Sequence, residues 1–537
     1  MKVSSGKSKL IAKRNIRLFA FLLLAFGLTL LSSRPQSADE TPAQQNSRES
    51  LSKLHRDAKK ATRAGKYEEA IKLFASLIEA DPNDLQARLG ASYAYLKAQY
   101  YLLSLERAID VLKVDRNNSR AHALAGLALL RSGMVNGAIV KFQQALSVNP
   151  KEALAYGGAA EIDYYEGRPK DSQGKALYAH VLDPDEPDYL VTYARASSRL
   201  EDFKEAAAAY ELYLDIAPIT DTERRERIKG LIHFYRQLSG LQVHQLSGPA
   251  LTDIPFYLGS DRRPYVKVKL NGRDAIFVID TGSGFTVISR ETAKRMGVSE
   301  IARGGKSQGV GGTGKFQIVY GLIKSLQLGD EKVKMVPCFI RPFHIDKDKA
   351  IEEKADGFIG LSILSHFLTE LDYKESRIRL DRRDNRTIPP ATTPDMTVVP
   401  FRTTQNGLIS VETEFDGNKN VNVILDSGAS STVISTAAVE RLNLGDQIIK
   451  DQTASVIGAA GVTENVRMLF VRKCSLAGLQ QTNLRALVLD FGAINETAGF
   501  EQSGILGGDF LRNFRVTIDF NRALLAFQPH TTSENHQ

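Results

Sequence analysis

The sequence is poor in cysteine and has no long apolar stretch at its N-terminus. Only Cys338 and Cys474 occur among its 537 residues, which excludes a scaffold held together by disulfides. They fall in different halves of a duplicated region described below. We therefore expect both to stay unpaired, as small buried apolar side chains. The apolar run 18–31 has 14 residues, fewer than the roughly 20 that a membrane-spanning helix needs.

Signatures of metal and cofactor chemistry are also missing. The nine histidines form no His-x-x-x-His pair and no His/Cys cluster, which argues against metal catalysis. No Gly-x-Ser-x-Gly elbow occurs, and neither cysteine has an evident partner histidine. The stretch 309–316 (GVGGTGKF) superficially resembles a phosphate loop, but Phe316 replaces the Ser or Thr that would hold magnesium and a strand-like run follows. We expect no metal and no cofactor.

The positive charge is concentrated at the N-terminus. The chain has a net charge of +8, of which the first 17 residues supply +6 before any acidic residue appears, so the rest nets only +2. Those residues are Lys2, Lys7, Lys9, Lys13, Arg14 and Arg17. No basic face on a folded domain is needed to explain the charge, and we expect no nucleic-acid partner.

The same basic cluster, followed by the run 18–31, is typical of a secretory signal peptide. It predicts a signal over 1–38, cleaved after Ala38, and a linker over 39–50. Gln36 stands where a small residue is preferred, so an uncleaved anchor that holds 18–31 in the membrane remains an alternative. Both interpretations predict that the remaining chain is exported, to the periplasm or the extracellular space.

Residues 51–240 repeat with a period of 34. The period is marked by Pro82, Pro150, Pro184 and Pro218, and Arg116 stands at the one position of this series that has no proline. Two more registers share the spacing: Tyr67, Tyr101, Val135, Pro169 and Phe203, and the small residues Ala70, Ser104, Ala138, Ser172 and Ala206. Helical apolar spacing that ends at a proline predicts paired helices, and the small residues let the helices approach closely.

This pattern resembles the tetratricopeptide repeat (TPR). It corresponds to five helix pairs, with the charged helix 221–238 as a solvent-facing cap. The resemblance implies an α-solenoid whose concave surface binds a protein or peptide partner. A purely structural or dimerising role of the repeats remains an alternative.

The second half of the chain is duplicated and consists of short β-rich runs broken by turns. The matching segments are 266–289 with 411–435, and 357–380 with 504–527. Their offsets of 146 and 147 predict two all-β lobes, over 251–384 and 399–530. The linker between the lobes is predicted over 385–398, where proline and threonine are frequent.

Each copy has a strand that ends in Asp-Thr/Ser-Gly. The motif residues are Asp280, Thr281, Gly282 and Ser283 in the first copy and Asp426, Ser427, Gly428 and Ala429 in the second. Glycine permits close backbone approach at such a turn, and the Thr and Ser hydroxyls can hydrogen-bond across to the other copy. Two facing copies would bring two carboxylates around one water. Because like charges about 3 Å apart cannot both ionise, the pair would share a proton.

The two motifs differ in their last residue. We expect the Ser283 hydroxyl to donate to Asp280 and to lower the pKa of that carboxyl, whereas Ala429 offers Asp426 no such donor. Asp280 would then be the base and Asp426 the acid.

The doubled motif resembles the aspartic peptidases, in size more the retropepsin-type halves fused in tandem than a long pepsin. The resemblance implies an all-β two-lobed acid-protease fold after the α-solenoid, and an endopeptidase with catalytic Asp280 and Asp426. It also implies two flaps over the cleft, with Gly309, Val310, Gly311 and Gly312 in one and Ile457 and Gly458 in the other. No clear flap tyrosine of the pepsin kind is present.

Two alternatives accompany this interpretation. The chain could be a non-catalytic peptide-binding or scaffold protein that keeps the fold alone. A complete site within one chain is expected, because both halves are present, but a dimer in which lobes swap between chains remains possible on sequence grounds.

Overall fold

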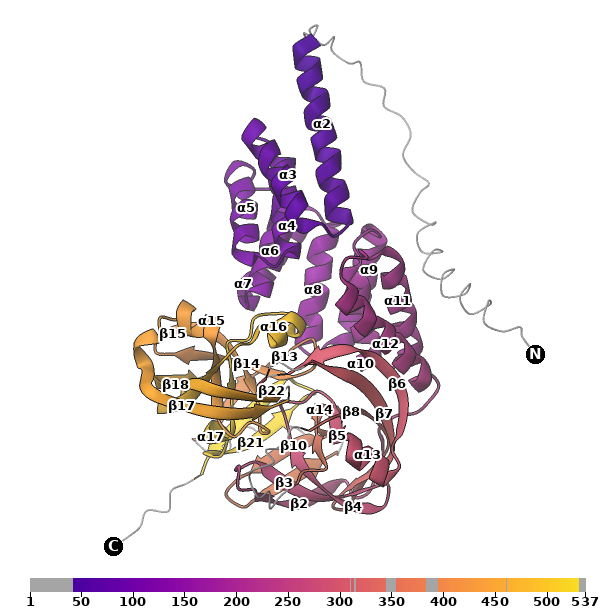
Figure 1. Ribbon diagram of the computed structural model, residues 1–537, viewed down its shortest axis with the longest axis vertical. Helices are drawn as coiled ribbons and strands as arrows, with labels where there is room; N and C mark the ends of the chain where they lie inside the picture. Colours follow the sequence, from indigo (N-terminus) through magenta and orange to yellow (C-terminus); the bar gives the residue numbers. More distant parts are fainter. Residues whose placement is uncertain are drawn as a thin grey trace, which may run out of the picture.

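The computed structural model describes residues 42–309, 311–312, 315–343, 354–382, 395–459 and 461–530. The predicted signal over 1–38, Val310 and most of the predicted linker 385–398 lie outside these residues. The described chain begins with helices and continues as a nearly all-β region (Figure 1). Within this described part, no helix combines the length and the apolarity needed to cross a bilayer.

Among the described residues, the helical region contains eleven helices, of which ten form five repeating pairs and the last, α12, follows them. The first helices of the pairs are α2 (Pro42–Arg63), α4 (Leu85–Lys97), α6 (Ser119–Arg131), α8 (Ala153–Tyr165) and α10 (Asp188–Arg199). The second helices are α3 (Tyr67–Ala80), α5 (Tyr101–Val114), α7 (Val135–Val148), α9 (Pro169–Leu182) and α11 (Phe203–Ile216). Every second helix begins at a residue of the 34-residue register, so the prediction of five helix pairs is confirmed.

The small residues of the repeat lie where the helices touch. The small-residue register Ala70, Ser104, Ala138, Ser172 and Ala206 is fully buried. The turn before each second helix contains a residue with positive φ, namely Gly65, Gln99, Gly133, Gly167 or Glu201. Three of these five are glycines, which adopt that conformation without strain.

The eleventh helix, α12 (Thr222–Leu238), does not face solvent as a cap, and this prediction is wrong. It packs against strand β6 (Ser299–Gln308) of the β region. A Cβ added to Gly230 would lie 2.1 Å from the Cα of Gly304, so the two backbones nearly touch. The Phe234 ring stacks on Tyr320 with centroids 4.3 Å apart. The prediction was based on the many charged residues of α12. The apolar, glycine-containing face of the same helix packs against the β region.

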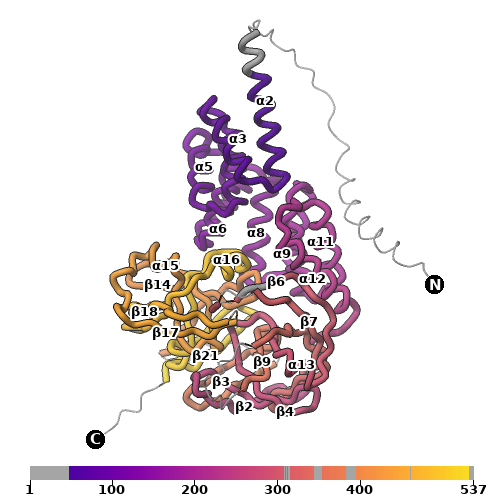
Figure 2. The backbone as a smooth tube through the Cα atoms, in the orientation of Figure 1, coloured from indigo at the N-terminus to yellow at the C-terminus, as the bar shows by residue number. Residues whose placement is uncertain are grey.

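The β region forms two lobes that lie side by side below the repeats (Figure 2). Lobe 1 contains β1 (Gln245–Ser247), β2 (Leu251–Leu258), β3 (Pro264–Leu270), β4 (Arg273–Ile279), β5 (Thr286–Ser289), β6, β7 (Lys315–Leu328), β8 (Glu331–Arg341), β9 (Gly357–Ile359), β10 (Leu368–Asp372) and β11 (Arg377–Asp381), with helices α13 (Arg290–Met296) and α14 (Leu361–Leu364).

Lobe 2 repeats this arrangement. It contains β12 (Thr397–Pro400), β13 (Arg402–Thr403), β14 (Ile409–Phe415), β15 (Asn418–Leu425), β16 (Thr432–Ser435), β17 (Ile448–Gly458), β18 (Gly461–Leu476), β19 (Leu479–Leu489), β20 (Gly504–Leu506), β21 (Phe514–Asp519) and β22 (Leu524–Pro529), with helices α15 (Thr436–Arg441), α16 (Gly492–Ala498) and α17 (Gly508–Leu511). The identical Thr-Val-Ile-Ser segments form β5 and β16. In each lobe the final serine caps the next helix, Ser289 through Thr292 N–H at 2.9 Å and Ser435 through Ala438 N–H at 3.0 Å.

The lobes are joined by a sheet to which both contribute. The part of this sheet that joins the lobes has the order β12-β22-β21-β10-β11-β2, from which the sheet continues through lobe 1. The crossing between lobes is the antiparallel pair β10–β21, with Thr369 opposite Ile518. The α-solenoid followed by an all-β two-lobed region is thus confirmed.

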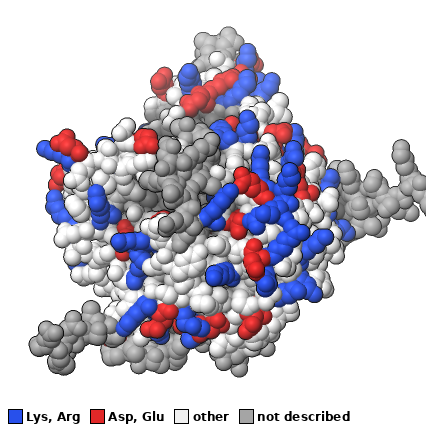
Figure 3. All heavy atoms as spheres, turned by 60° about the horizontal axis from the view of Figure 1, so that its bottom comes forward, with Lys and Arg blue, Asp and Glu red and all other residues white. Residues whose placement is uncertain are grey.

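Cys338 and Cys474 are free and buried in their separate lobes, as predicted. On the face shown in Figure 3, Asp and Glu side chains lie among the Lys and Arg ones.

Candidate active site

Asp280 and Asp426 occupy equivalent positions at the ends of two central strands. Asp280 follows β4 and Asp426 follows β15. Strand β9 pairs in parallel with β4, and β20 pairs in parallel with β15. The backbone N–H of Asp280 donates to the Ile359 carbonyl of β9, and that of Asp426 donates to the Leu506 carbonyl of β20, each at 3.0 Å. The strand pairing therefore fixes both backbone turns in the same way.

The hydroxyls that follow the aspartates interlock the lobes. The Thr281 hydroxyl donates to the Leu425 carbonyl at 2.8 Å and accepts from Ser427 N–H at 2.9 Å. In return, the Ser427 hydroxyl donates to the Ile279 carbonyl at 2.8 Å and accepts from Thr281 N–H at 3.1 Å. Both side chains are buried. Four crossed hydrogen bonds thus hold the two aspartate turns face to face.

The glycines of the two motifs face the opposite carboxylates. A Cβ added to Gly282 would lie 2.2 Å from the carboxylate of Asp426, and one added to Gly428 would lie 2.5 Å from that of Asp280. Each carboxylate also accepts from its own turn: Gly282 N–H donates to Asp280 at 2.9 Å, and Gly428 N–H donates to Asp426 at 2.8 Å. Any larger residue at either glycine would separate the pair.

The environment raises the pKa of both carboxyls. Burial raises the pKa of Asp280 well above its usual range, and the charge of Asp426 and the hydrogen bond with it raise it further. Burial also raises the pKa of Asp426, but several hydrogen bonds counteract the effect. The donors that lower it are the Asp280 carboxyl and the N–H groups of Gly428, Ala429 and Gly282. These donors favour the ionised form of Asp426, whereas the charge of Asp426 favours the protonated form of Asp280.

The expectation about Ser283 is wrong. Its hydroxyl donates to the Phe285 carbonyl at 2.8 Å, within its own turn, and not to Asp280. In lobe 2 the backbone N–H of Ala429 donates to Asp426 at 3.1 Å, so the residue without a hydroxyl provides the additional donor. The hydrogen bond on which the assignment of Asp280 as base and Asp426 as acid was based is therefore absent.

Two hairpins, one from each lobe, meet at their tips. We call β6–β7 the first flap and β17–β18 the second flap. At their tips Gly312 N–H donates to the Thr463 hydroxyl at 2.6 Å. A Cβ on Gly309 would lie 2.4 Å from the Ala459 Cβ, and a Cβ on Gly311 would lie 3.0 Å from Gly458. The predicted flap residues Gly309, Gly311, Gly312, Ile457 and Gly458 thus lie in these hairpins, whereas Val310 lies outside the described residues.

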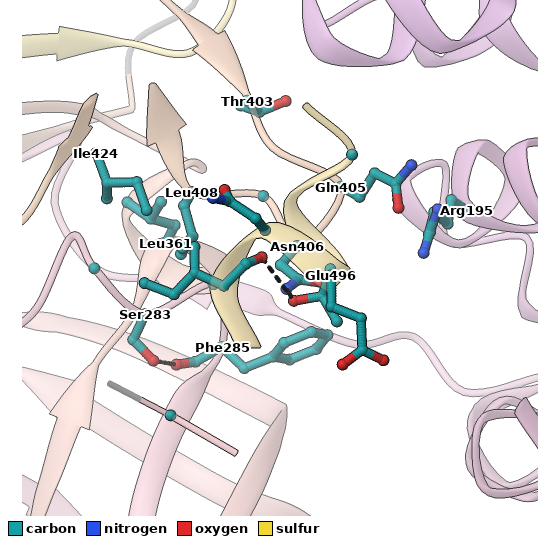
Figure 4. Close-up of a pocket in the computed structure, with 18 of the residues that line it drawn as sticks. Arg195, Ser283, Phe285, Leu361, Thr403, Gln405, Asn406, Leu408, Ile424 and Glu496 are labelled. Carbon is teal, nitrogen blue, oxygen red and sulfur yellow. Dashed lines mark hydrogen bonds between the residues drawn. The ribbon is translucent and has the colours of Figure 1, made fainter. Parts of the chain in front are cut away.

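The two lobes and the helices of the repeats line one continuous cavity of about 1940 Å³. Tyr93 and Arg224 of the repeats line it together with Asp280 and Asp426. Figure 4 shows residues from all three parts around a pocket here; those labelled are Ser283, Phe285 and Leu361 of lobe 1, Thr403, Gln405, Asn406, Leu408, Ile424 and Glu496 of lobe 2, and Arg195 of the repeats.

The repeats are anchored to both lobes around this cavity. Arg131 Nη1 donates to the Gly499 carbonyl of lobe 2 at 3.0 Å, and Asn422 Nδ2 donates to the Gly133 carbonyl at 2.9 Å. Lys315 of the first flap forms an ion pair with Glu223 of α12 at 2.8 Å. No pattern in the sequence indicates these contacts, because their partners are far apart in the chain.

Among the described residues, one group has the composition of a metal site. Glu201, His244 and His366 place one ligand atom each within 4.8 Å of one another. His244 Nδ1 lies 3.2 Å from the Glu201 carboxylate. The group lies where the repeats meet lobe 1, and sequence inspection missed it because the three residues are distant in the chain.

Comparisons with known proteins find matches in both the helical and the β part of the chain. Residues 266–363 and 411–510 each match the family model of the aspartyl proteases. Among solved structures, the chain is similar to an aspartic proteinase from Irpex lacteus, with 13% identity, 53% of this chain and 99% of that chain covered, and a TM-score of 0.36. It is also similar to a thermophilic TPR protein from Thermus thermophilus, with 20% identity, 34% of this chain and 98% of that chain covered, and a TM-score of 0.29. The aspartyl protease match therefore occurs twice in this chain, once in each lobe.

Proposed function

We propose that the protein is an aspartic endopeptidase that uses Asp280 and Asp426 to hydrolyse peptide bonds. The observation that supports this most is the set of crossed Thr281 and Ser427 hydrogen bonds, which holds both carboxyls in one site. The ionised Asp426 takes a proton from the attacking water, and the protonated Asp280 donates to the carbonyl oxygen of the scissile bond. No covalent acyl-enzyme is needed.

The repeats are proposed to recruit a protein partner or substrate and to orient it for the cleft. The continuous cavity supports this, because a chain bound on the concave side of the helices would run directly toward the carboxylates.

Export to the periplasm or the extracellular space, with 1–38 as signal or anchor, is proposed from the sequence. A reporter fused after Gln537 that works only outside the cytoplasm tests it, and activity of a cytoplasm-only reporter would contradict it.

The central experiment replaces each carboxylate by its amide. Asp280→Asn and Asp426→Asn should each lower kcat on a peptide library by about 100- to 10,000-fold, since neither amide can share the proton. The exposed Asp446 provides a matched control, and Asp446→Asn should leave kcat unchanged. Turnover within tenfold of wild type in either active-site variant would contradict the assignment. Peptide binding without any cleavage by the wild type would favour the non-catalytic alternative.

A further inference from the structure

The two walls of the cleft differ in charge at equivalent positions. In lobe 1, β5 pairs in parallel with β8, and Ser289 lies opposite Arg341. In lobe 2, β16 pairs in parallel with β19, and Ser435 lies opposite Leu489. Because β5 and β16 have the same sequence, Thr-Val-Ile-Ser, this register makes Arg341 the counterpart of Leu489.

A second register extends the comparison to the neighbouring strands. Val287 of β5 lies opposite Phe358 of β9, and Val433 of β16 lies opposite Ile505 of β20. These lobe 2 positions are apolar, because Leu489, Ile505 and Val433 belong to one buried cluster. The lobe 1 wall instead combines a cation with aromatic rings.

Arg341 lies within a group of phenylalanines. Its guanidinium carbon is 5.3 Å from the ring centroid of Phe343 and 5.8 Å from those of Phe316 and Phe358. These residues line the cavity together with Asp280. The faces of the rings attract the guanidinium and hold it in place, but they carry no formal negative charge that would neutralise it.

The hydrogen-bonding capacity of Arg341 is mostly unused. A guanidinium has five N–H donors, and among the described residues only the Ala459 carbonyl of the second flap accepts one, at 3.3 Å. Of the carboxylates that the structure describes, only Asp280 acts on its charge, and Asp280 is needed for chemistry. The nearby Arg263 differs, since Asp261 neutralises it at 2.6 Å.

We propose that Arg341 forms a subsite for a carboxylate of the substrate, and that the equivalent wall at Leu489 takes an apolar side chain on the other side of the scissile bond. This inference rests on the proposed peptidase function. An arginine fork binds a carboxylate through two parallel hydrogen bonds. A glutamine in the substrate cannot accept both of them, and a leucine in the wall of the cleft can donate neither. The carboxylate belongs to an Asp or Glu side chain or to the C-terminus of a peptide.

The test uses octapeptides that carry Glu or Gln at each position in turn, with amidated or free C-termini. For the full-length wild type, kcat/KM should be about 10- to 100-fold higher for Glu than for Gln at one position on one side of the scissile bond. If free-acid peptides are cleaved faster than amidated ones and Glu and Gln peptides do not differ, the carboxylate is the C-terminus, and Arg341→Met should then abolish the preference for the free acid. Arg341→Met should bring the Glu-to-Gln ratio close to one, and Arg341→Lys should retain part of it. The exposed Arg472 serves as control through Arg472→Met, which should not change the ratio.

The exchange of the two walls gives the sharpest readout. In the double variant Arg341→Leu with Leu489→Arg, the preference for Glu should move to the opposite side of the scissile bond. If the double variant does not fold, the ratio measured in Arg341→Met decides instead. The proposal is overturned if the wild type shows no carboxylate preference, or if Arg341→Met slows Glu and Gln peptides by the same factor, since Arg341 would then only hold the second flap.

A binding measurement separates this proposal from the proposed function. If the wild type cleaves nothing, the peptidase function fails, and the anisotropy of labelled Glu and Gln peptide pools then tests the subsite alone. Tighter binding of the Glu or free-acid pool, lost in Arg341→Met, would support the subsite without catalysis. Equal binding of all pools would overturn it.

Discussion

The two flaps come from equivalent hairpins but have different neighbours. The first flap is packed along its β6 strand against α12 of the repeats, with Gly230 and Gly304 in near contact and Phe234 stacked on Tyr320. In the second flap the apolar side chain of Ile457 is 45% exposed, and the tip contacts the other lobe through Thr463. A duplicated element has thus become a fixed wall in one lobe and a less supported one in the other.

This difference indicates how the cleft can open. A hairpin that is backed by a helix moves only with that helix, whereas a hairpin held mainly at its tip can move when that contact breaks. We therefore expect the second flap to move during substrate entry and the first flap to respond to events in the repeats. Amide exchange that is slower in β6–β7 than in β17–β18 would agree with this; the reverse order would contradict it.

The largest expected effect tests whether the lobes are interchangeable. Each lobe supplies one carboxyl, and Thr281 and Ser427 interlock within a single chain. A mixture of inactive Asp280→Asn and Asp426→Asn chains should therefore regain no activity at any concentration. Specific activity of the wild type should also stay constant on dilution. Recovered turnover in the mixture would show that lobes pair between chains.

The next largest effect concerns the backing of the first flap. Gly230→Ala should destabilise the protein by about 1–3 kcal/mol, because the new Cβ would overlap the Gly304 backbone. Gly174→Ala in α9 is the matched control, since nothing lies within 4 Å of its added Cβ, and it should stabilise the helix by about 0.5–1 kcal/mol. Chemical unfolding measures both. Equal effects of the two changes would mean that α12 does not support the flap.

The packing of α12 against the first flap also shows what the sequence could not predict. The 34-residue period placed the start of every second helix, and the duplication placed both aspartates, because each pattern is repeated along the chain. The packing of α12 was not predictable, since its charged residues pair with partners such as Lys315 and Glu496 that are distant in sequence. The role of Arg341 was hidden too, because only the pairing of β8 with β5 identifies its counterpart Leu489.

A smaller effect compares the two carboxyls through pH. The pKa of Asp280 is raised well above its usual range by burial and by Asp426, so its folded-state value exceeds its unfolded value of about 3.9. Its contribution to stability is therefore full below about pH 4 and is lost as pH rises through the folded pKa. The stability of Asp280→Asn relative to wild type should increase with pH above about 4. The stability of Asp426→Asn relative to wild type should increase less over the same pH range, because hydrogen bonds partly offset the raised pKa of Asp426. Denaturant unfolding between pH 3 and pH 7 measures this, and a larger gain in Asp426→Asn would reverse the proton assignment.

The smallest effect concerns two ion pairs that connect α12 to the lobes. Lys315–Glu223 ties it to the first flap at 2.8 Å, and Arg227–Glu496 ties it to α16 of lobe 2 at 2.5 Å. The side chains of the first pair are 46% and 59% exposed, whereas Arg227 is only 21% exposed. Exposed pairs contribute about 0.2–1 kcal/mol, so double-mutant cycles should give coupling energies in that range, with the larger value for Arg227–Glu496. Both should fall as salt rises from low to about 1 M, because screening shortens the range of exposed charges. Since the apolar and glycine contacts of α12 do not depend on salt in this way, the first flap should remain protected from amide exchange at high salt. Loss of that protection would show that charge, and not packing, fixes the first flap to the repeats.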